Sequence, residues 1–152
     1  MIFDPPEVRV FTIGHADRAP EEFLGMLRAA GVEFVVDVRS RPTSRRAPWS
    51  ARPVLQQTLA GAGVGYVYMG DSLGGLRDDF EARRETVAYR TGLEELARLA
   101  AGRPTAILCA ERDPRACHRF AVADDLARRG LVVVHLVDPG RNEPHPHPLT
   151  FR

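Results

Sequence analysis

The stretch TAILCAERDPRACHRF at residues 105–120 passes from an apolar run into a polar loop and then into a helical pattern. Its first six residues are typical of a buried strand. Asp113 followed by Pro114 is typical of a helix start, because aspartate caps the first turn and proline fits the first helical position. The pattern predicts a strand, a polar loop and a helix over 114–129, which is one repeating step of an α/β fold.

The same alternation of strand and helix patterns continues in both directions along the chain. Further strands are expected at 8–14, 34–38, 65–70 and 131–137, and further helices at 20–31, 53–62 and 81–101. The run FVVDV is almost continuously apolar, as expected for a parallel strand covered on both faces. We therefore predict a single three-layer α/β domain, residues 1–138, with a mostly parallel five-stranded sheet, helices on both faces and strand order 3-2-1-4-5. Residues 139–152 are expected to form an extended tail containing proline and histidine.

Composition excludes several classes of protein. All 21 basic residues are arginine, which excludes Schiff-base chemistry or a lysine general base. The two cysteines do not make the disulfide framework of a small secreted protein. No apolar run is long enough for a signal peptide or a membrane span, so we expect a cytoplasmic protein without a membrane partner.

Polar residues follow the expected strands where parallel strands end. The strands end in TIGH, DVRSRP, YMGDSLGG and CAERDP, which deliver His15, Asp37, Arg39, Cys109 and Glu111 to one edge. Ligands of open α/β sheets bind beyond the carboxyl ends of the strands. Asp37 interrupts an apolar run, and a buried carboxylate needs a partner, for which Arg39 lies on the same face.

The helix over 114–129 places three neighbouring residues on different sides. Arg119 falls within its apolar stripe, Cys117 on a flank, and His118 on the opposite side. An arginine facing the sheet should be buried. We expect it to pair with Asp37 or Glu111, or to contact the anionic group of a ligand.

The two cysteines allow several interpretations. Cys109 and Arg115 have a Cys-x5-Arg spacing, as in cysteine phosphatases, although two acids and a proline disfavour an anion cradle there. Cys109, Cys117, His118 and His15 could bind a metal, but they lack the close spacing of structural zinc sites. A dithiol pair or plain packing remains open, and we assign no metal or cofactor.

The loop RSRPTSRRAPWSAR at 39–52 is the best candidate for binding an anion. It contains five arginines, several hydroxyl groups and no acid, and Trp49 offers an aromatic face for stacking. Arginine suits bidentate contacts with phosphate, and an aromatic side chain suits an unstacked base.

The chain resembles the DUF488 family of uncharacterised bacterial and archaeal proteins in six motifs that occur in the same order. They are TIGH (12–15), VVDVRSRPTSRR (35–46), LGG (73–75), CAE (109–111), CHR (117–119) and ADDL (123–126). The likeness spans about residues 9–137. It implies a compact α/β domain with a pocket built from these motifs, but no particular reaction. The motif positions that the resemblance picks out are His15, Asp37, Arg39, Ser44, Cys109, Glu111, Cys117, His118 and Arg119.

These observations favour an enzyme that binds a phosphate-containing substrate, either a nucleotide or a nucleic acid. Its candidate catalytic residues are Glu111, Asp37, His15, His118, Cys109 and Cys117, with either carboxylate as general acid or base. Its candidate anion-binding residues are Arg39, Arg41, Ser44, Arg45, Arg46 and Arg119. One alternative is a non-catalytic module that binds nucleic acid or another partner, and a second is a metal or redox protein using the cysteines and histidines.

Overall fold

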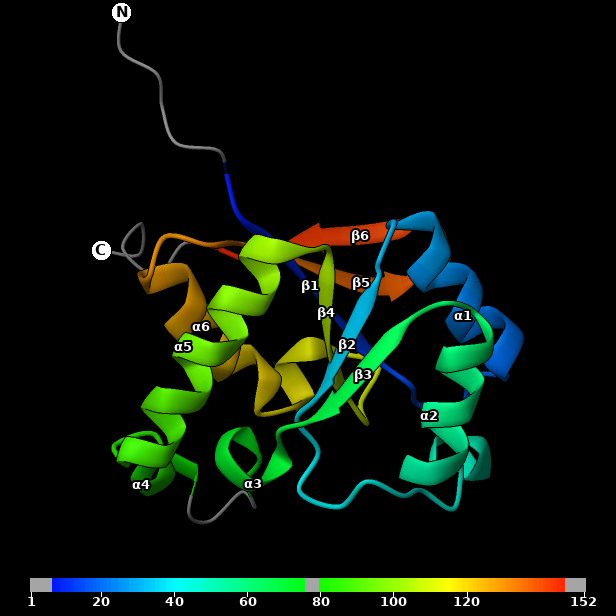
Figure 1. Cartoon of the computed structure of the whole chain (residues 1–152), viewed down its shortest axis with the longest axis horizontal. Coiled ribbons are helices and arrows are strands. Elements are labelled where there is room, and N and C mark those ends of the chain that lie inside the picture. The colour runs from blue at the N-terminus through cyan, green and yellow to red at the C-terminus, as the bar shows by residue number, and fades with distance from the viewer. Residues whose placement is uncertain (1–6, 76–79, 147–152) are drawn as a thin grey trace, which may run out of the picture.

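The structure, a computed structural model, describes residues 7–75 and 80–146. Its elements, including two 3-10 helices labelled η, are β1 (Arg9–Gly14), α1 (Pro20–Ala29), β2 (Phe34–Asp37), η1 (Pro48–Ser50), α2 (Arg52–Gly61), β3 (Gly65–Tyr68), α3 (Gly70–Leu73), α4 (Phe80–Arg83), α5 (Val87–Gly102), β4 (Thr105–Cys109), η2 (Pro114–Ala116), α6 (Arg119–Arg128), β5 (Val132–Asp138) and β6 (Arg141–Pro144). Figure 1 shows one sheet with α1 and α2 on one side and α5 and α6 on the other. The predicted three-layer α/β domain with a mostly parallel sheet is confirmed.

The core consists of two apolar layers, one on each face of the sheet. Successive side chains of a strand point to opposite faces, so neighbouring valines of β2 belong to different layers. Val35 packs with Phe23 of α1, whereas Val36 packs with Leu96 of α5. Burial on both faces explains why the strand sequences are almost continuously apolar.

The predicted strand order 3-2-1-4-5 is wrong in one respect. The observed order is β3-β2-β4-β1-β5-β6, so β4 lies between β2 and β1 instead of beyond β1. β1 and β4 are both apolar and suited to a central position, so hydrophobic pattern does not rank them. The sheet also gains a sixth strand, β6, which pairs antiparallel with β5 and lies in the segment expected to be an extended tail.

The position of β4 determines which loops meet. Leu108 pairs in register with Asp37 of β2, and Cys109 pairs with Gly14 of β1. All three strands run parallel, so the loops that follow them lie side by side at the carboxyl edge of the sheet. The CAE loop is therefore flanked by both the TIGH and the DVR motifs.

Two predicted helices are interrupted. The helix expected over 81–101 is divided into α4 and α5, because the Thr86 hydroxyl accepts a hydrogen bond from the Tyr89 amide and caps a new helix. The helix expected over 114–129 is divided into η2 and α6, with Cys117 extended between them. None of the helices in the described ranges is long and apolar enough to cross a membrane.

Candidate functional site

Cys109 and Cys117 form a disulfide at the carboxyl edge of the sheet. Cys109 ends β4, and the turn of η2 brings the chain back across it. The Asp113 carboxylate starts that turn by accepting a hydrogen bond from the Arg115 amide at 2.9 Å. The extended backbone of Cys117 then directs its sulfur toward Cys109. A dithiol pair was one of the possibilities open from the sequence, and the fold brings the two sulfurs together.

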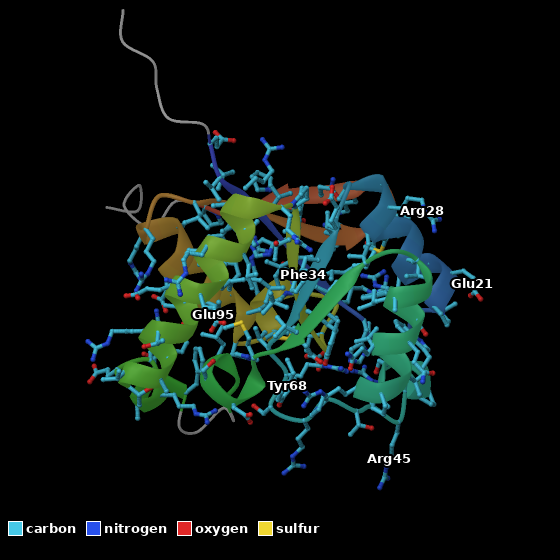
Figure 2. The ribbon with its side chains drawn as sticks, in the orientation of Figure 1. Glu21, Arg28, Phe34, Arg45, Tyr68 and Glu95 are labelled. Carbon is cyan, nitrogen blue, oxygen red and sulfur yellow. A yellow bond between two sulfur atoms is a disulfide. The ribbon has the colours of Figure 1, made fainter. Side chains whose placement is uncertain are left out.

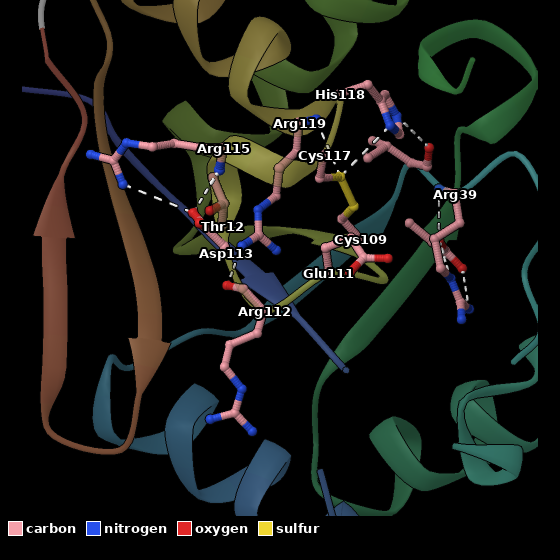
Figure 3. The surroundings of a disulfide bond; sticks show 12 residues. Thr12, Arg39, Cys109, Glu111, Arg112, Asp113, Arg115, Cys117, His118 and Arg119 are labelled. Carbon is pink, nitrogen blue, oxygen red and sulfur yellow. Dashed lines mark hydrogen bonds and ion pairs between the residues drawn. A yellow bond between two sulfur atoms is a disulfide. The ribbon is translucent and has the colours of Figure 1, made fainter. Parts of the chain in front are cut away.

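His118 lies against this disulfide, as Figure 3 shows. Its Nδ1 is 3.7 Å from the Cys117 sulfur, and its Nε2 is 3.0 Å from the backbone oxygen of Val38. A carbonyl can only accept a hydrogen bond, so Nε2 carries the proton and Nδ1 of the neutral ring keeps a free lone pair. Burial lowers the pKa of His118, which favours this neutral form. The expectation that His118 points away from the core is wrong, because the ring also packs edge-on against Phe80 at 5.2 Å.

The disulfide and His118 line a pocket of about 280 Å³ at this edge. Its walls come from the loop after β2, Gly75 just beyond α3, the CAE loop, the end of η2 and the two residues that precede α6. The lining residues are Arg39, Ser40, Arg41, Gly75, Cys109, Ala110, Glu111, Ala116, Cys117 and His118. The pocket thus brings together the DVR, LGG, CAE and CHR motifs.

Asp37 and Arg39 form a buried ion pair that holds the loop after β2. Arg39 donates from Nε to one Asp37 oxygen at 2.9 Å and from Nη2 to the other at 2.8 Å. Tyr66 donates its hydroxyl to the same carboxylate at 2.6 Å, and Arg39 also reaches the Ser50 oxygen at 2.8 Å. The expected partnership of these two residues is confirmed. Their contacts leave Asp37 outside the pocket lining and occupy the Arg39 guanidinium.

The other arginines of the loop are exposed to solvent. Arg41 lines the pocket, and Arg46 lies 3.6 Å from a Glu111 oxygen across the two loops. Figure 2 shows Arg45 extending away from the molecule. Ser44 is half-buried and is not among the pocket-lining residues. Of the predicted anion-binding side chains, Arg41 and Arg46 are therefore the best placed.

Ser40 is one of the hydroxyl-bearing residues of the 39–52 loop, and it lines the pocket although it was not among the predicted site residues. Its hydroxyl oxygen is buried and has no hydrogen-bond partner within the described ranges. A buried polar group without a hydrogen bond costs free energy of folding. A bound water or a ligand could supply the hydrogen bond that the Ser40 hydroxyl does not make with described residues. The sequence signal was its position between Arg39 and Arg41, two of the predicted anion-binding residues.

His15 packs against Trp49, which belongs to the arginine-rich loop at 39–52. The two rings meet edge to face with centroids 6.4 Å apart, and Trp49 donates its Nε1 hydrogen to the Arg18 oxygen at 2.8 Å. Trp49 also contacts Phe23 of the core, so its ring is not a free stacking surface. Burial lowers the pKa of His15 to about 4, and His15 does not line the pocket.

Arg119 is fully buried, as predicted, but its expected carboxylate partner is absent. It donates from Nη2 to the backbone oxygen of Arg112 at 3.0 Å, whereas Nε and Nη1 find no partner in the described parts of the chain. Burial lowers the pKa of Arg119 to about 10. The prediction of an ion pair with Asp37 or Glu111 is wrong because Asp37 is taken by Arg39 and Glu111 points its side chain toward Arg46.

A buried chain of polar side chains links the sheet to the C-terminal segment. The Thr12 hydroxyl lies 2.6 Å from Nδ1 of His135, whose Nε2 lies 2.8 Å from Nδ1 of His145. Nε2 of His145 in turn lies 2.6 Å from an Asp124 oxygen. This network was not predicted from the sequence, although His135 interrupts an apolar strand just as Asp37 does.

The family model for a domain of unknown function, DUF488, matches residues 19–126. The chain belongs to the DUF488 family. No curated protein and no solved structure matches it. The matched range contains all four pocket-lining motifs of this DUF488 protein, and it ends within α6.

Proposed function

We propose that this DUF488 protein is an enzyme that binds a phosphate-containing substrate, a nucleotide or a nucleic-acid end, in the pocket at the carboxyl edge of its sheet. The observation that carries the proposal is the convergence of Arg41, the unpartnered Ser40 hydroxyl, Glu111 and His118 on one pocket. Such a group of cationic, donor and acid–base side chains suits binding and reaction of an anion.

Arg41 and Ser40 would bind the phosphate group of the substrate. Arg41 is exposed and forms no ion pair with any described residue, so its guanidinium is available to a phosphate oxygen. The Ser40 hydroxyl is buried without a partner among the described residues, so its side chain would have to turn into the pocket to donate to the phosphate. A volume of about 280 Å³ is near the lower end of ligand pockets, which favours a phosphate with a small organic group.

Glu111 and His118 would transfer protons in the reaction. Glu111 has a side chain 45% exposed, which leaves it accessible to a substrate, while Arg46 at 3.6 Å steadies its carboxylate. It is the residue we assign as general acid or base, because Asp37 is fully engaged with Arg39 and Tyr66. Neutral His118, with its free Nδ1, is the second group able to accept a proton.

Isothermal titration of the oxidised protein with adenosine monophosphate and with inorganic phosphate, at low salt, tests the proposal. A charge-assisted hydrogen bond contributes about 1.5–3 kcal/mol, so Arg41→Ala should weaken binding roughly 10- to 100-fold. Arg28→Ala is the matched control, because Arg28 is an exposed arginine on α1, away from the arginine loop (Figure 2). Absence of binding to the wild-type protein would overturn the proposal.

A non-catalytic module that binds nucleic acid or a protein partner is the alternative outcome. It would use the exposed arginines alone, since Trp49 is packed against Phe23 and His15. The variant Glu111→Gln separates the two functions. A binding module should keep its affinity and its biological role after this change, whereas an enzyme should keep its affinity and lose turnover.

The disulfide favours a second candidate function, thiol–disulfide exchange. In that reaction a dithiol substrate attacks the Cys109–Cys117 bond, passes two electrons to it, and leaves as a disulfide while both cysteines become thiols. Equilibration with mixtures of reduced and oxidised glutathione, followed by thiol counting, tests whether the pair is redox-active. A disulfide that stays intact across the accessible range of potentials would exclude this candidate.

A further inference from the structure

We propose that reduction of the disulfide turns Cys109, Cys117 and His118 into a binding site for one zinc ion, with a fourth coordination position open to the pocket. The two sulfurs and one ring nitrogen of His118 all lie within 4.8 Å of one another. All three residues line the pocket. The site does not depend on the phosphate-binding proposal, because its ligands are not the residues proposed to hold the phosphate.

The orientation of His118 suits a metal ligand. Histidines that bind metals usually donate their second ring hydrogen to a carbonyl or carboxylate, which fixes the ring and leaves the other nitrogen free. His118 has this arrangement, with Nε2 held by the Val38 oxygen at 3.0 Å and Nδ1 directed at the Cys117 sulfur. Packing against Phe80 restricts the ring further. The imidazole is therefore oriented before any metal arrives.

The backbone spacing of the cysteines also suits two thiolates that share an ion. Their Cα atoms are 7.2 Å apart, which exceeds the 4.4–6.8 Å that a disulfide usually spans. Sulfurs bound to one zinc ion are further apart than bonded sulfurs, since each lies about 2.3 Å from the metal. The Arg119 amide, at the first turn of α6, donates to the Cys117 sulfur at 3.4 Å and would support a thiolate there.

The ligand set points to zinc and to a reactive site. Two thiolates and an imidazole are soft or intermediate ligands, which favour zinc over magnesium or calcium. Structural zinc sites have four protein ligands, whereas catalytic sites have three and keep a position for water or substrate. Here the three ligands border an open pocket with Glu111 in its wall, so a zinc-bound water or phosphate oxygen would face that carboxylate.

Binding is gated by the redox state of the pair. A dithiol reductant supplies two electrons and two protons, which break the S–S bond and form two thiols while the reductant becomes a disulfide. Zinc binding then displaces the two thiol protons, because the metal ligand is the thiolate. Oxidation by a disulfide reverses both steps and releases the ion.

The experiment uses the full-length protein without a histidine tag, reduced with a phosphine under anaerobic conditions and titrated with zinc against a chromophoric chelator. We expect one zinc ion per reduced chain and none per oxidised chain. His118→Gln should weaken binding by at least about 100-fold, since even loss of an outer-shell partner costs 10- to 100-fold. His145→Gln is the matched control, because it removes a histidine outside the site, and its affinity should match the wild type.

X-ray absorption of the zinc-loaded wild-type protein provides a test that needs no variant. The proposal predicts two sulfur neighbours at about 2.3 Å and nitrogen or oxygen neighbours at about 2.0–2.1 Å. Equal zinc binding by oxidised and reduced protein would overturn the proposal, as would unchanged affinity in a folded His118→Gln variant. Phosphate titration of the oxidised, zinc-free protein is a separate measurement, so failure of either proposal is distinguished from failure of the other.

Discussion

The backbone oxygen of Glu111 occupies the place where residue 14 would carry a Cβ atom. A Cβ built on Gly14 would lie 1.7 Å from that oxygen and 2.8 Å from Nη1 of Arg119. The close contact arises because β4 pairs directly with β1, which presses the CAE loop against the end of the TIGH motif. The glycine of TIGH is therefore required by its neighbour in space.

Replacing Gly14 with alanine should displace the CAE loop and destabilise the protein. Backbone atoms cannot move aside as a flexible side chain can, so we expect a loss at the upper end of the 1–3 kcal/mol typical of overpacking. Thermal unfolding checks this, with Gly25→Ala on α1 as control, because a Cβ at position 25 would meet no described atom within 4 Å outside its chain neighbours and its own helix backbone. Equal melting temperatures for the two variants would contradict the assigned contact.

Breaking the Asp37–Arg39 pair should cost far more than breaking an exposed ion pair. Asp37→Asn leaves the buried guanidinium without its charge partner, at about 3–5 kcal/mol. Glu81→Gln is the matched control, because Glu81 is 84% exposed although it lies 3.1 Å from Arg84. The control should lose no more than about 1 kcal/mol. Similar losses in urea unfolding would argue against a structural role for the buried pair.

Arg119 pairs with neither Asp37 nor Glu111, so replacing it with an apolar side chain of similar size should change the free energy of unfolding only slightly. Arg119→Met keeps most of the side-chain volume and removes a buried charge, two of whose nitrogens have no partner in the described part of the chain. We expect its stability to lie within about 1 kcal/mol of the wild type, whereas Arg119→Ala opens a cavity and should lose about 2–5 kcal/mol. Urea unfolding of both variants checks the difference. If methionine were as damaging as alanine, the expectation that the buried charge contributes little net stability would be wrong.

Stability should fall as the pH drops below about 6.5, the ordinary value of histidine. Burial lowers the pKa of His15 to about 4 and that of His135 to about 3, so both are neutral when folded. The unfolded chain binds protons at these positions between pH 6.5 and 4, which favours unfolding. Each histidine should contribute a slope approaching about 1.4 kcal/mol per pH unit.

Denaturant titrations at pH 7.5, 6 and 5 measure this slope. The range stays above the region in which most carboxylates take up protons, so the histidines dominate. A stability that does not change between pH 7.5 and 5 would show that His15 and His135 remain protonatable in the folded protein.

The sequence was sufficient to predict the α/β class and the edge at which the motifs meet. Apolar runs identify strands buried on both faces, and parallel strands bring TIGH, DVR and CAE to one edge whatever their order. The order itself was not predictable, because Thr105–Cys109 and Arg9–Gly14 are similar apolar runs and either could lie next to β2. Only long-range packing separates the two arrangements.

Predictions for individual site residues failed where the local backbone departs from a regular helix. The burial of Arg119 was predicted from a helical wheel and is confirmed. The disulfide and the orientation of His118 were not predictable in the same way, because Cys117 is extended and interrupts the helix between η2 and α6. The Thr12–His135–His145–Asp124 network was missed because it depends on β6 and the segment after it folding back onto the sheet.

Binding of a phosphate-containing ligand in the pocket is tested by titrating isotope-labelled protein with adenosine monophosphate. The amide chemical shifts are recorded at each step of the titration. If the ligand binds in the pocket, we expect saturable shifts at Ser40, Arg41, Gly75 and Glu111, with the amides of α1 unchanged. Shifts spread over exposed arginines without saturation, or no shifts at the pocket, would contradict it.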